Sequence, residues 1–214
     1  MPTIADLGTR IELVAMDPHF QDISIALYEQ ERNGTTVALV HSYSSKGGTG
    51  DRLRSIADSM GALGDLERGE TEAATVRFAC GTWHRAAAKR AFLEACKLLP
   101  GQPATARPLE AEDRRSGQSI VVEGLRGGRY RVHAQGAQDE SKSRAPAIAR
   151  GLAKLAELDL DEDGVTVAFG CGQDHDAVVG LLLVRALNLR ATLREDEVTS
   201  SRGVLAAPSA QEQP

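Results

Sequence analysis

Apolar and polar residues alternate in two neighbouring segments near the start of the chain, residues 23–29 and 35–43. Alternation with a period of two predicts β-strands that bury one face. The Asn33-Gly34 pair between the two segments favours a tight hairpin, because both residues tolerate a positive φ. A further strand is expected over residues 10–16.

A helix is predicted after this hairpin, because apolar side chains recur there every three or four residues. They are Leu53, Ile56, Met60 and Leu63. A short apolar segment at residues 75–80 then predicts another strand, and residues 84–99 predict a second helix. The first half of the chain is therefore expected to be built as β-β-α-β-α.

The second half shows the same order of patterns. Two alternating segments, residues 119–124 and 129–134, flank Gly127-Gly128 and predict a second hairpin. Apolar residues at helical spacing follow it, at Ile148, Leu152 and Leu155. A strand is then expected at residues 166–171 and a helix at residues 174–194.

The two halves also share residues at matching positions, which indicates an internal repeat. Residues 75–86 and 166–177 align at an interval of 91 with seven identities in twelve positions. The identical residues include the Cys and His of each segment, Cys80 and His84 against Cys171 and His175. Upstream the interval becomes 92, and it then aligns His41 with His133 and Arg52 with Arg144.

These patterns predict an α/β fold in the broad sense, an α+β layered tandem duplication of a ββαβα unit with pseudo-twofold symmetry. The expected organisation is a first repeat with an extra strand at residues 1–99, a linker at 100–118, a second repeat at 119–202 and a flexible tail at 203–214. A half of about 90 residues buries only a modest core, and residues 177–189 are apolar on nearly all sides. We therefore expect the two repeats to pack together as one compact domain.

Composition narrows the class of protein. Hydrophobic residues make up 42% of the chain, charged residues 26%, and the formal net charge is −5. An acidic chain with few aromatic residues is not expected to be a general nucleic-acid binder. The longest nearly apolar stretch, residues 177–184, is too short for a membrane helix, and residues 1–10 lack the apolar core of a secretory signal. With only three cysteines, we expect a soluble protein in a reducing compartment, the cytoplasm.

The candidate chemistry lies at the ends of the predicted strands. If each strand–helix–strand connection is a crossover between parallel strands, His41 and Cys80 reach the same edge of the sheet, where ligands of α/β proteins bind. His84 would lie in the first turn of the next helix. The same argument collects the matching residues of the second half, His133, Cys171 and His175.

A metal site is one interpretation of these residues. Cysteine thiolates and neutral imidazoles are zinc ligands, and four of them form a closed tetrahedral site. If the pseudo-twofold axis brings the two turns together, Cys80, His84, Cys171 and His175 make a Cys2His2 set. Alternatively, each half could use one Cys and two His and leave one coordination position open.

Three other interpretations remain open. A helix N-terminus and a nearby His can activate a Cys as a nucleophile, and two such Cys can act on opposite faces of one substrate. The residues can also be structural, with Cys packed as a small hydrophobe and His satisfying backbone groups in a tight turn. The two helix N-termini can instead bind an anion. No motif identifies a substrate or a reaction, so the sequence does not decide whether the protein is an enzyme.

The best-supported function from the sequence is a small-molecule or transition-metal site at the pseudo-twofold axis. The alternative is a non-catalytic interaction or scaffold module whose basic helix meets an acidic partner. The basic side chains of that helix are Arg85, Lys89, Arg90 and Lys97. We further expect Glu94 and its repeat counterpart Arg185 to approach each other across the axis.

Overall fold

The computed structural model describes residues 10–20, 22–32, 35–43, 49–69, 74–135 and 143–189. In this part of the chain, four helices and two antiparallel sheets form an α+β fold. The Asn33-Gly34 turn and the tail expected at residues 203–214 lie outside the described residues.

The first sheet has the strand order β1-β2-β3-β5-β4. Its strands are β1 (Arg10–Met16), β2 (Ser24–Arg32), β3 (Thr35–Tyr43), β4 (Leu66–Arg68) and β5 (Ala74–Phe78). The first half also contains two helices, α1 (Gly50–Gly64) and α2 (Arg85–Lys97).

The second sheet repeats this arrangement, with the strand order β6-β7-β8-β10-β9. Its strands are β6 (Glu110–Asp113), β7 (Gln118–Leu125), β8 (Arg129–Gln135), β9 (Asp159–Leu160) and β10 (Thr166–Ala168). The helices of this half are α3 (Ala145–Ala156) and α4 (Asp176–Asn188). The chain therefore forms the strands of both sheets in the same spatial order.

The structure confirms the predicted hairpin strands, the opening strand and the four helices. Three short strands, β4, β6 and β9, were not predicted, because two to four residues are too few to show an alternating pattern. One of them, β6, lies within residues 100–118, the segment expected to be a linker.

The prediction of parallel strands on either side of the crossover is wrong. β3 pairs antiparallel with β5, with Ala38 opposite Val76, and β8 pairs antiparallel with β10, with Tyr130 opposite Val167. The cause is the unpredicted strand in each half. After α1 the chain first forms β4 at the sheet edge, and β5, which runs antiparallel to β4, then pairs with β3.

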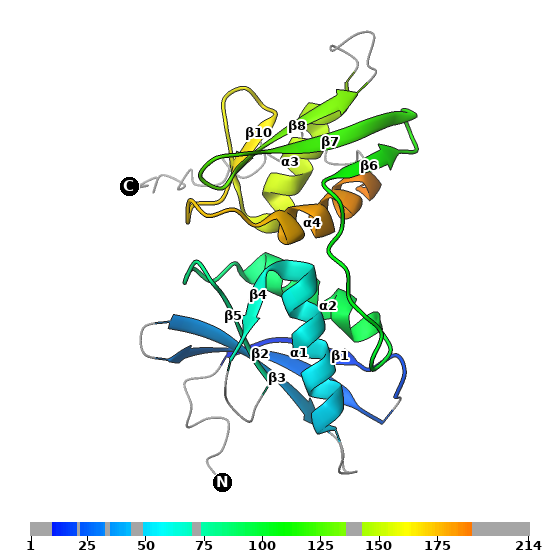
Figure 1. Ribbon diagram of the computed structural model, residues 1–214, viewed down its shortest axis with the longest axis vertical. Helices are drawn as coiled ribbons and strands as arrows, with labels where there is room; N and C mark the ends of the chain where they lie inside the picture. Colours follow the sequence, from blue (N-terminus) through cyan, green and yellow to red (C-terminus); the bar gives the residue numbers. More distant parts are fainter. Residues whose placement is uncertain are drawn as a thin grey trace, which may run out of the picture.

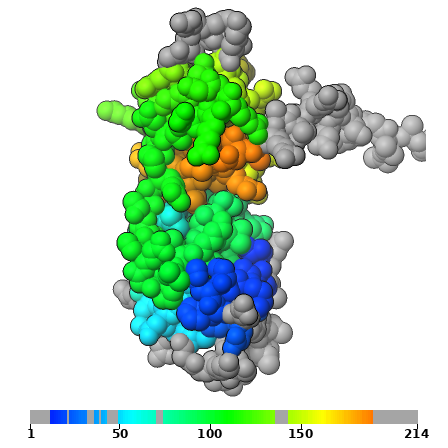
Figure 2. Space-filling view, turned by 90° about the vertical axis from the view of Figure 1, so that its right-hand side faces the viewer, coloured from blue at the N-terminus to red at the C-terminus, as the bar shows by residue number. Residues whose placement is uncertain are grey.

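Helices occupy the middle of the molecule, and the two sheets lie on the outside (Figure 1). Helix α4 contacts α1 and α2 of the first half as well as α3 of its own half. Figure 2 shows α4, in orange, between the upper and lower parts of the molecule. Nine of its residues are buried, which agrees with its apolar sequence. None of the helices in the described part of the chain is long and apolar enough to cross a membrane.

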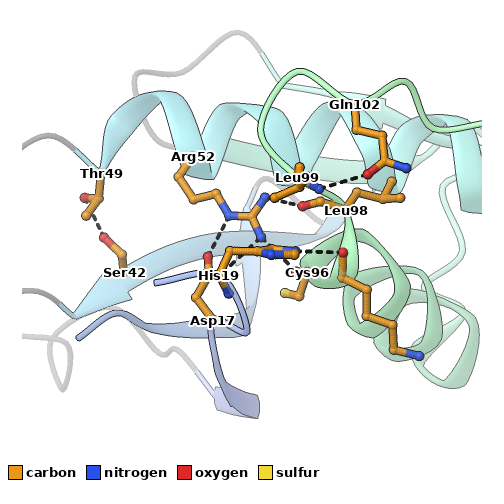
Figure 3. A network of polar contacts seen from close by, with 10 residues as sticks. Asp17, His19, Ser42, Thr49, Arg52, Cys96, Leu98, Leu99 and Gln102 are labelled. Carbon is orange, nitrogen blue, oxygen red and sulfur yellow. Dashed lines mark hydrogen bonds and ion pairs between the residues drawn. The ribbon is translucent and has the colours of Figure 1, made fainter. Parts of the chain in front are cut away.

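A buried ion pair connects the first sheet to the helices (Figure 3). Arg52 of α1 donates from Nε to Asp17 Oδ2 at 2.6 Å, and its other nitrogens donate to the carbonyl oxygens of Leu98 and Cys96 at 2.7 Å. Both side chains of the pair are at least 95% buried. The guanidinium therefore holds the end of β1, α1 and the end of α2 together.

The second half has an ion pair at the matching place. Arg144, which aligns with Arg52 at an interval of 92 residues, donates to both carboxylate oxygens of Asp113 at the end of β6. The Asp113 side chain is only 1% exposed. Each half thus uses an Arg at the start of its first helix to bind an Asp at the end of its first strand.

The expected approach of Glu94 to Arg185 is not observed as an ion pair. Glu94 binds Arg90 and Lys97 of its own helix. Arg185 is exposed on α4. Because these two cations lie three and four residues from Glu94 on the same helix face, they neutralise its carboxylate without a cation from the other half.

Candidate metal site

The candidate site is formed by the turns that connect β5 to α2 and β10 to α4. In the first turn Gly81 has a φ of +76° and its N–H donates to the Phe78 carbonyl oxygen at 3.1 Å. A residue with a side chain is strained at this φ, so the Gly that follows Cys80 allows the tight bend. His84 then stands immediately before the first residue of α2.

The second turn has the same geometry. Gly172 has a φ of +68°, and its N–H donates to the Phe169 carbonyl oxygen at 3.0 Å. His175 stands immediately before α4. The two Cys-Gly-x-x-His sequences therefore fold into the same strand-to-helix turn.

The structure brings the Cys and His side chains of both turns into one group. One potential ligand atom from each of Cys80, His84, Cys171 and His175 lies within 4.8 Å of the other three. The Nε2 atom of His84 is 3.3 Å from Cys80 Sγ, and the Nε2 atom of His175 is 3.3 Å from Cys171 Sγ. Such a group can hold a metal ion, with two ligands from each half of the chain.

Aromatic rings hold the two imidazoles in place. The His84 and His175 rings meet edge to face with centroids 4.6 Å apart. Phe78 contacts them at 4.9 and 5.7 Å, and Phe169 contacts them at 5.1 and 4.7 Å. Because each Phe packs against the His of both halves, the imidazoles have little freedom to rotate away from the thiols.

The backbone of His175 is also anchored. Its N–H donates to the hydroxyl oxygen of Tyr130 at 2.5 Å, and that hydroxyl donates to Asp176 Oδ1 at 2.9 Å. The His175 side chain is buried, and its Nδ1 atom has no hydrogen-bond partner among the described residues. Tyr130 therefore fixes the position of the most deeply buried member of the group.

Burial controls the protonation of these side chains. Burial and the neighbouring His175 lower the pKa of His84 to about 4. Burial likewise lowers the pKa of His175, although Asp174 and Asp176 oppose the shift. Burial and the proximity of Cys171 raise the pKa of Cys80. Both imidazoles are thus neutral at pH 7, which is the form that binds metal ions.

These shifts do not favour a thiolate–imidazolium pair at rest. In such a pair the thiolate is stable beside a protonated imidazole. Here burial destabilises both charged forms, at Cys80 and at His84. A divalent cation would reverse this balance, since it stabilises two adjacent thiolates and accepts neutral imidazoles.

A purely structural role also fits less well. Cys80 and Cys171 are only partly buried, whereas Cys96, outside the group, is 3% exposed. The Nε2 atom of each His faces a thiol rather than a backbone group. The arrangement therefore differs from that of Cys packed as a small hydrophobe.

The remaining two predicted histidines, His41 and His133, lie outside this group of four. His41 follows Val40, which pairs with Ala74 at the start of β5, whereas Cys80 follows the end of β5. Antiparallel pairing thus places His41 and Cys80 at opposite ends of that strand. The same holds for His133, which is beyond the start of β10. His41 is exposed, and its ring contacts Tyr28.

The basic face of α2, considered for an acidic partner, is paired within the chain. Arg85 binds Glu29 and Glu12, and Lys89 binds Glu12. The other two basic residues of this face, Arg90 and Lys97, bind Glu94. Little positive charge is left unneutralised for a partner.

Tyr130, Phe78 and Phe169 are residues of the site that sequence reasoning did not select. A signal for the two Phe was available, because they are identical in the repeat alignment. Tyr130 gave none, since Ala38 stands at its counterpart position in the first half. No known protein family, curated protein or solved structure matches the chain, so the site must be interpreted from its own geometry.

Proposed function

We propose that the chain is a metal-binding protein in which Cys80, His84, Cys171 and His175 bind one transition-metal ion, with zinc as the expected metal. One observation supports this proposal above all. Four potential ligand atoms, from two turns that are 91 residues apart in the sequence, lie within 4.8 Å of one another. Two thiols and two neutral imidazoles are the donor set of a Cys2His2 zinc site.

The distances support a tetrahedral site. With zinc–sulfur bonds of about 2.3 Å and zinc–nitrogen bonds of about 2.0–2.1 Å, the edges of the tetrahedron are about 3.3–3.8 Å. The sulfur–nitrogen separation within each turn is 3.3 Å, and every separation in the group is at most 4.8 Å. Small side-chain rotations therefore suffice to complete the coordination.

The proposed ion has a structural role. Four protein ligands fill a tetrahedral site and leave no position for a substrate. Since each half supplies one Cys and one His, the ion would connect β5–α2 to β10–α4. A metal-thiolate site of this kind needs reduced cysteines, and all three cysteines are free thiols. We therefore also propose a reducing location, the cytoplasm.

We propose further that the fold arose by tandem duplication and has pseudo-twofold symmetry. The identical strand orders and the matching ion pairs Asp17–Arg52 and Asp113–Arg144 support this history. Charges between the halves are also arranged in a matching way. Asp65, after α1, accepts hydrogen bonds from the start of α4, and the carboxylate of its counterpart Glu157, after α3, attracts the Arg85 guanidinium at the start of α2.

Elemental analysis of untagged, purified protein tests the metal site directly. We expect one zinc or other transition-metal ion per chain in the wild type after dialysis against metal-free buffer. Cys80→Ala and Cys171→Ala each remove one of four ligands and should lower the metal content at least tenfold under the same dialysis. Retention of a full equivalent by both variants would refute the proposal.

Two variants serve as matched controls. Cys96→Ala removes the third thiol and His133→Ala removes an imidazole, yet neither residue belongs to the group of four. Both should retain the wild-type metal content. Loss of metal from these variants as well would indicate binding by unfolded or nonspecific Cys and His side chains.

A further inference from the structure

The thiols of Cys80 and Cys171 come from different halves of the chain and lie close together. Their sulfur atoms are at most 4.8 Å apart. A disulfide has a sulfur–sulfur bond of about 2.05 Å, so the two atoms need to approach by less than about 3 Å. Cys96, the third cysteine, is buried in α2, where its carbonyl oxygen accepts from Arg52, and it is not in the group.

Only weak contacts within their own turns oppose this movement. Besides its His neighbour, Cys80 Sγ contacts the Thr82 carbonyl oxygen at 3.5 Å, and Cys171 Sγ contacts the Gln173 carbonyl oxygen at 3.9 Å and accepts from the Gln173 N–H at 3.5 Å. Both Cys lie in turns rather than in strands or helices. Rotation about the Cα–Cβ bonds, with adjustment of the two turns, brings the sulfurs together without breaking a strand pair or a helix.

We propose that Cys80 and Cys171 form a reversible intrachain disulfide when the site carries no metal, so that a metal ion and a disulfide are alternative cross-links between the same two turns. This inference rests on the proposed function for its metal-bound state only. The oxidant is a peroxide, and its small size suits two half-buried thiols.

In the overall reaction, two thiols and one hydrogen peroxide give one disulfide and two waters. One sulfur attacks a peroxide oxygen, the O–O bond breaks, and the first water leaves with the thiol proton, which the imidazole at 3.3 Å can relay. The product is a sulfenic acid. The second thiol then attacks that sulfur, the S–O bond breaks, and the hydroxyl takes up the proton of the second thiol and leaves as the second water.

The experiment compares metal-free and zinc-loaded full-length protein after treatment with one equivalent of hydrogen peroxide. We expect metal-free protein to fall from three titratable thiols to one per chain in denaturant, and dithiothreitol to restore all three. Peptide mapping should identify Cys80 linked to Cys171 within one chain. Zinc should slow the loss of thiols at least tenfold, because each of the two sulfurs uses a lone pair to bind the metal.

Variants of the cysteines distinguish the possible outcomes of this experiment. Cys96→Ala should still form the link, whereas Cys171→Ser should not. A link to Cys96, a link between chains, or oxidation to sulfinic acid without a link would overturn the inference, even if metal stoichiometry is as proposed. Equal rates with and without zinc, together with a normal Cys80–Cys171 link, would instead overturn the metal-bound state and with it the proposed function.

Discussion

At the scale of single residues, Tyr130 shows how the fold holds a ligand in place. Its hydroxyl accepts from the His175 N–H and donates to Asp176, while its ring is fully buried against Phe169. A buried N–H without an acceptor costs about 1–3 kcal/mol. Tyr130 is thus a positioning residue for the proposed site rather than a ligand.

Tyr130→Phe tests this role, because it keeps the ring and removes only the hydroxyl. We expect the free energy of unfolding, measured in urea, to fall by about 1–3 kcal/mol. We also expect metal affinity to fall, since His175 loses its anchor, with zinc competition against a chromogenic chelator as the measurement. If stability falls but affinity is unchanged, Tyr130 supports only the fold.

The buried carboxylate of Asp113 predicts a pH dependence of stability. Burial opposes its charge, but hydrogen bonds from Ser116, Arg115 and Arg144 outweigh burial and lower its pKa. A lowered pKa in the folded state stabilises the fold above the unfolded value of about 3.9, and this contribution disappears as the pH falls through the lower, folded value.

Urea unfolding of wild type and Asp113→Asn at several pH values measures this contribution. The variant should be less stable near pH 7. The difference should begin to shrink at about pH 4, where the unfolded chain takes up a proton, and should disappear below the lower pKa of the folded state. Asp58→Asn is the control, since Asp58 forms an exposed ion pair with Arg68 and should change stability little. A difference that persists unchanged to pH 2 would contradict the role of the ion pair.

At the scale of elements, the N-terminus of α4 is capped by a residue of the other half. His175 makes no side-chain capping bond, but Asp65 Oδ2 accepts from the N–H groups of Ala177 and Val178 at 2.9 and 3.4 Å. Asp65 itself has a φ of +55° just after α1. One carboxylate therefore connects the end of α1 with the start of α4, directly beside the proposed ligand His175.

Asp65→Ala should lower the free energy of unfolding by about 1–2 kcal/mol, because it removes the acceptor for two N–H groups at a helix start. Asp65→Asn is the matched control. Asn tolerates a positive φ and keeps a carbonyl oxygen in the same place, so it should retain most of the stability. Equal losses in both variants would assign the effect to the charge rather than to capping.

The elements also show what the sequence could and could not predict. The paired Cys-Gly-x-x-His sequences located all four members of the group, because identical residues at a fixed interval fold into identical turns. The positions predicted for His41 and His133 were wrong. Strands as short as β4 and β9 show no periodic pattern in the sequence, yet they make the next strand pair antiparallel rather than parallel. Asp65 and Tyr130 could not be predicted either, since their partners depend on how the two halves pack.

At the scale of the whole molecule, the proposed ion would add a bond between halves that also contact through their helices, through the Phe and His rings of the two turns and through Asp65. A ligand that binds only the folded state raises the free energy of unfolding in proportion to the logarithm of its concentration. At a free metal concentration 1,000 times the Kd, the gain is about 4 kcal/mol. Because the ligands are shared, the metal should stabilise both halves together.

Thermal unfolding of wild type and Cys80→Ala, each with zinc and with a chelator, measures this coupling. We expect zinc to raise the Tm of the wild type by several degrees and to merge the unfolding of both halves into one transition, because neither half can unfold without losing two ligands. The Tm of Cys80→Ala should respond little to either addition. An equal rise of Tm in the variant would mean that zinc binds elsewhere, and a wild-type protein whose halves unfold separately with zinc bound would show that the ion does not join them.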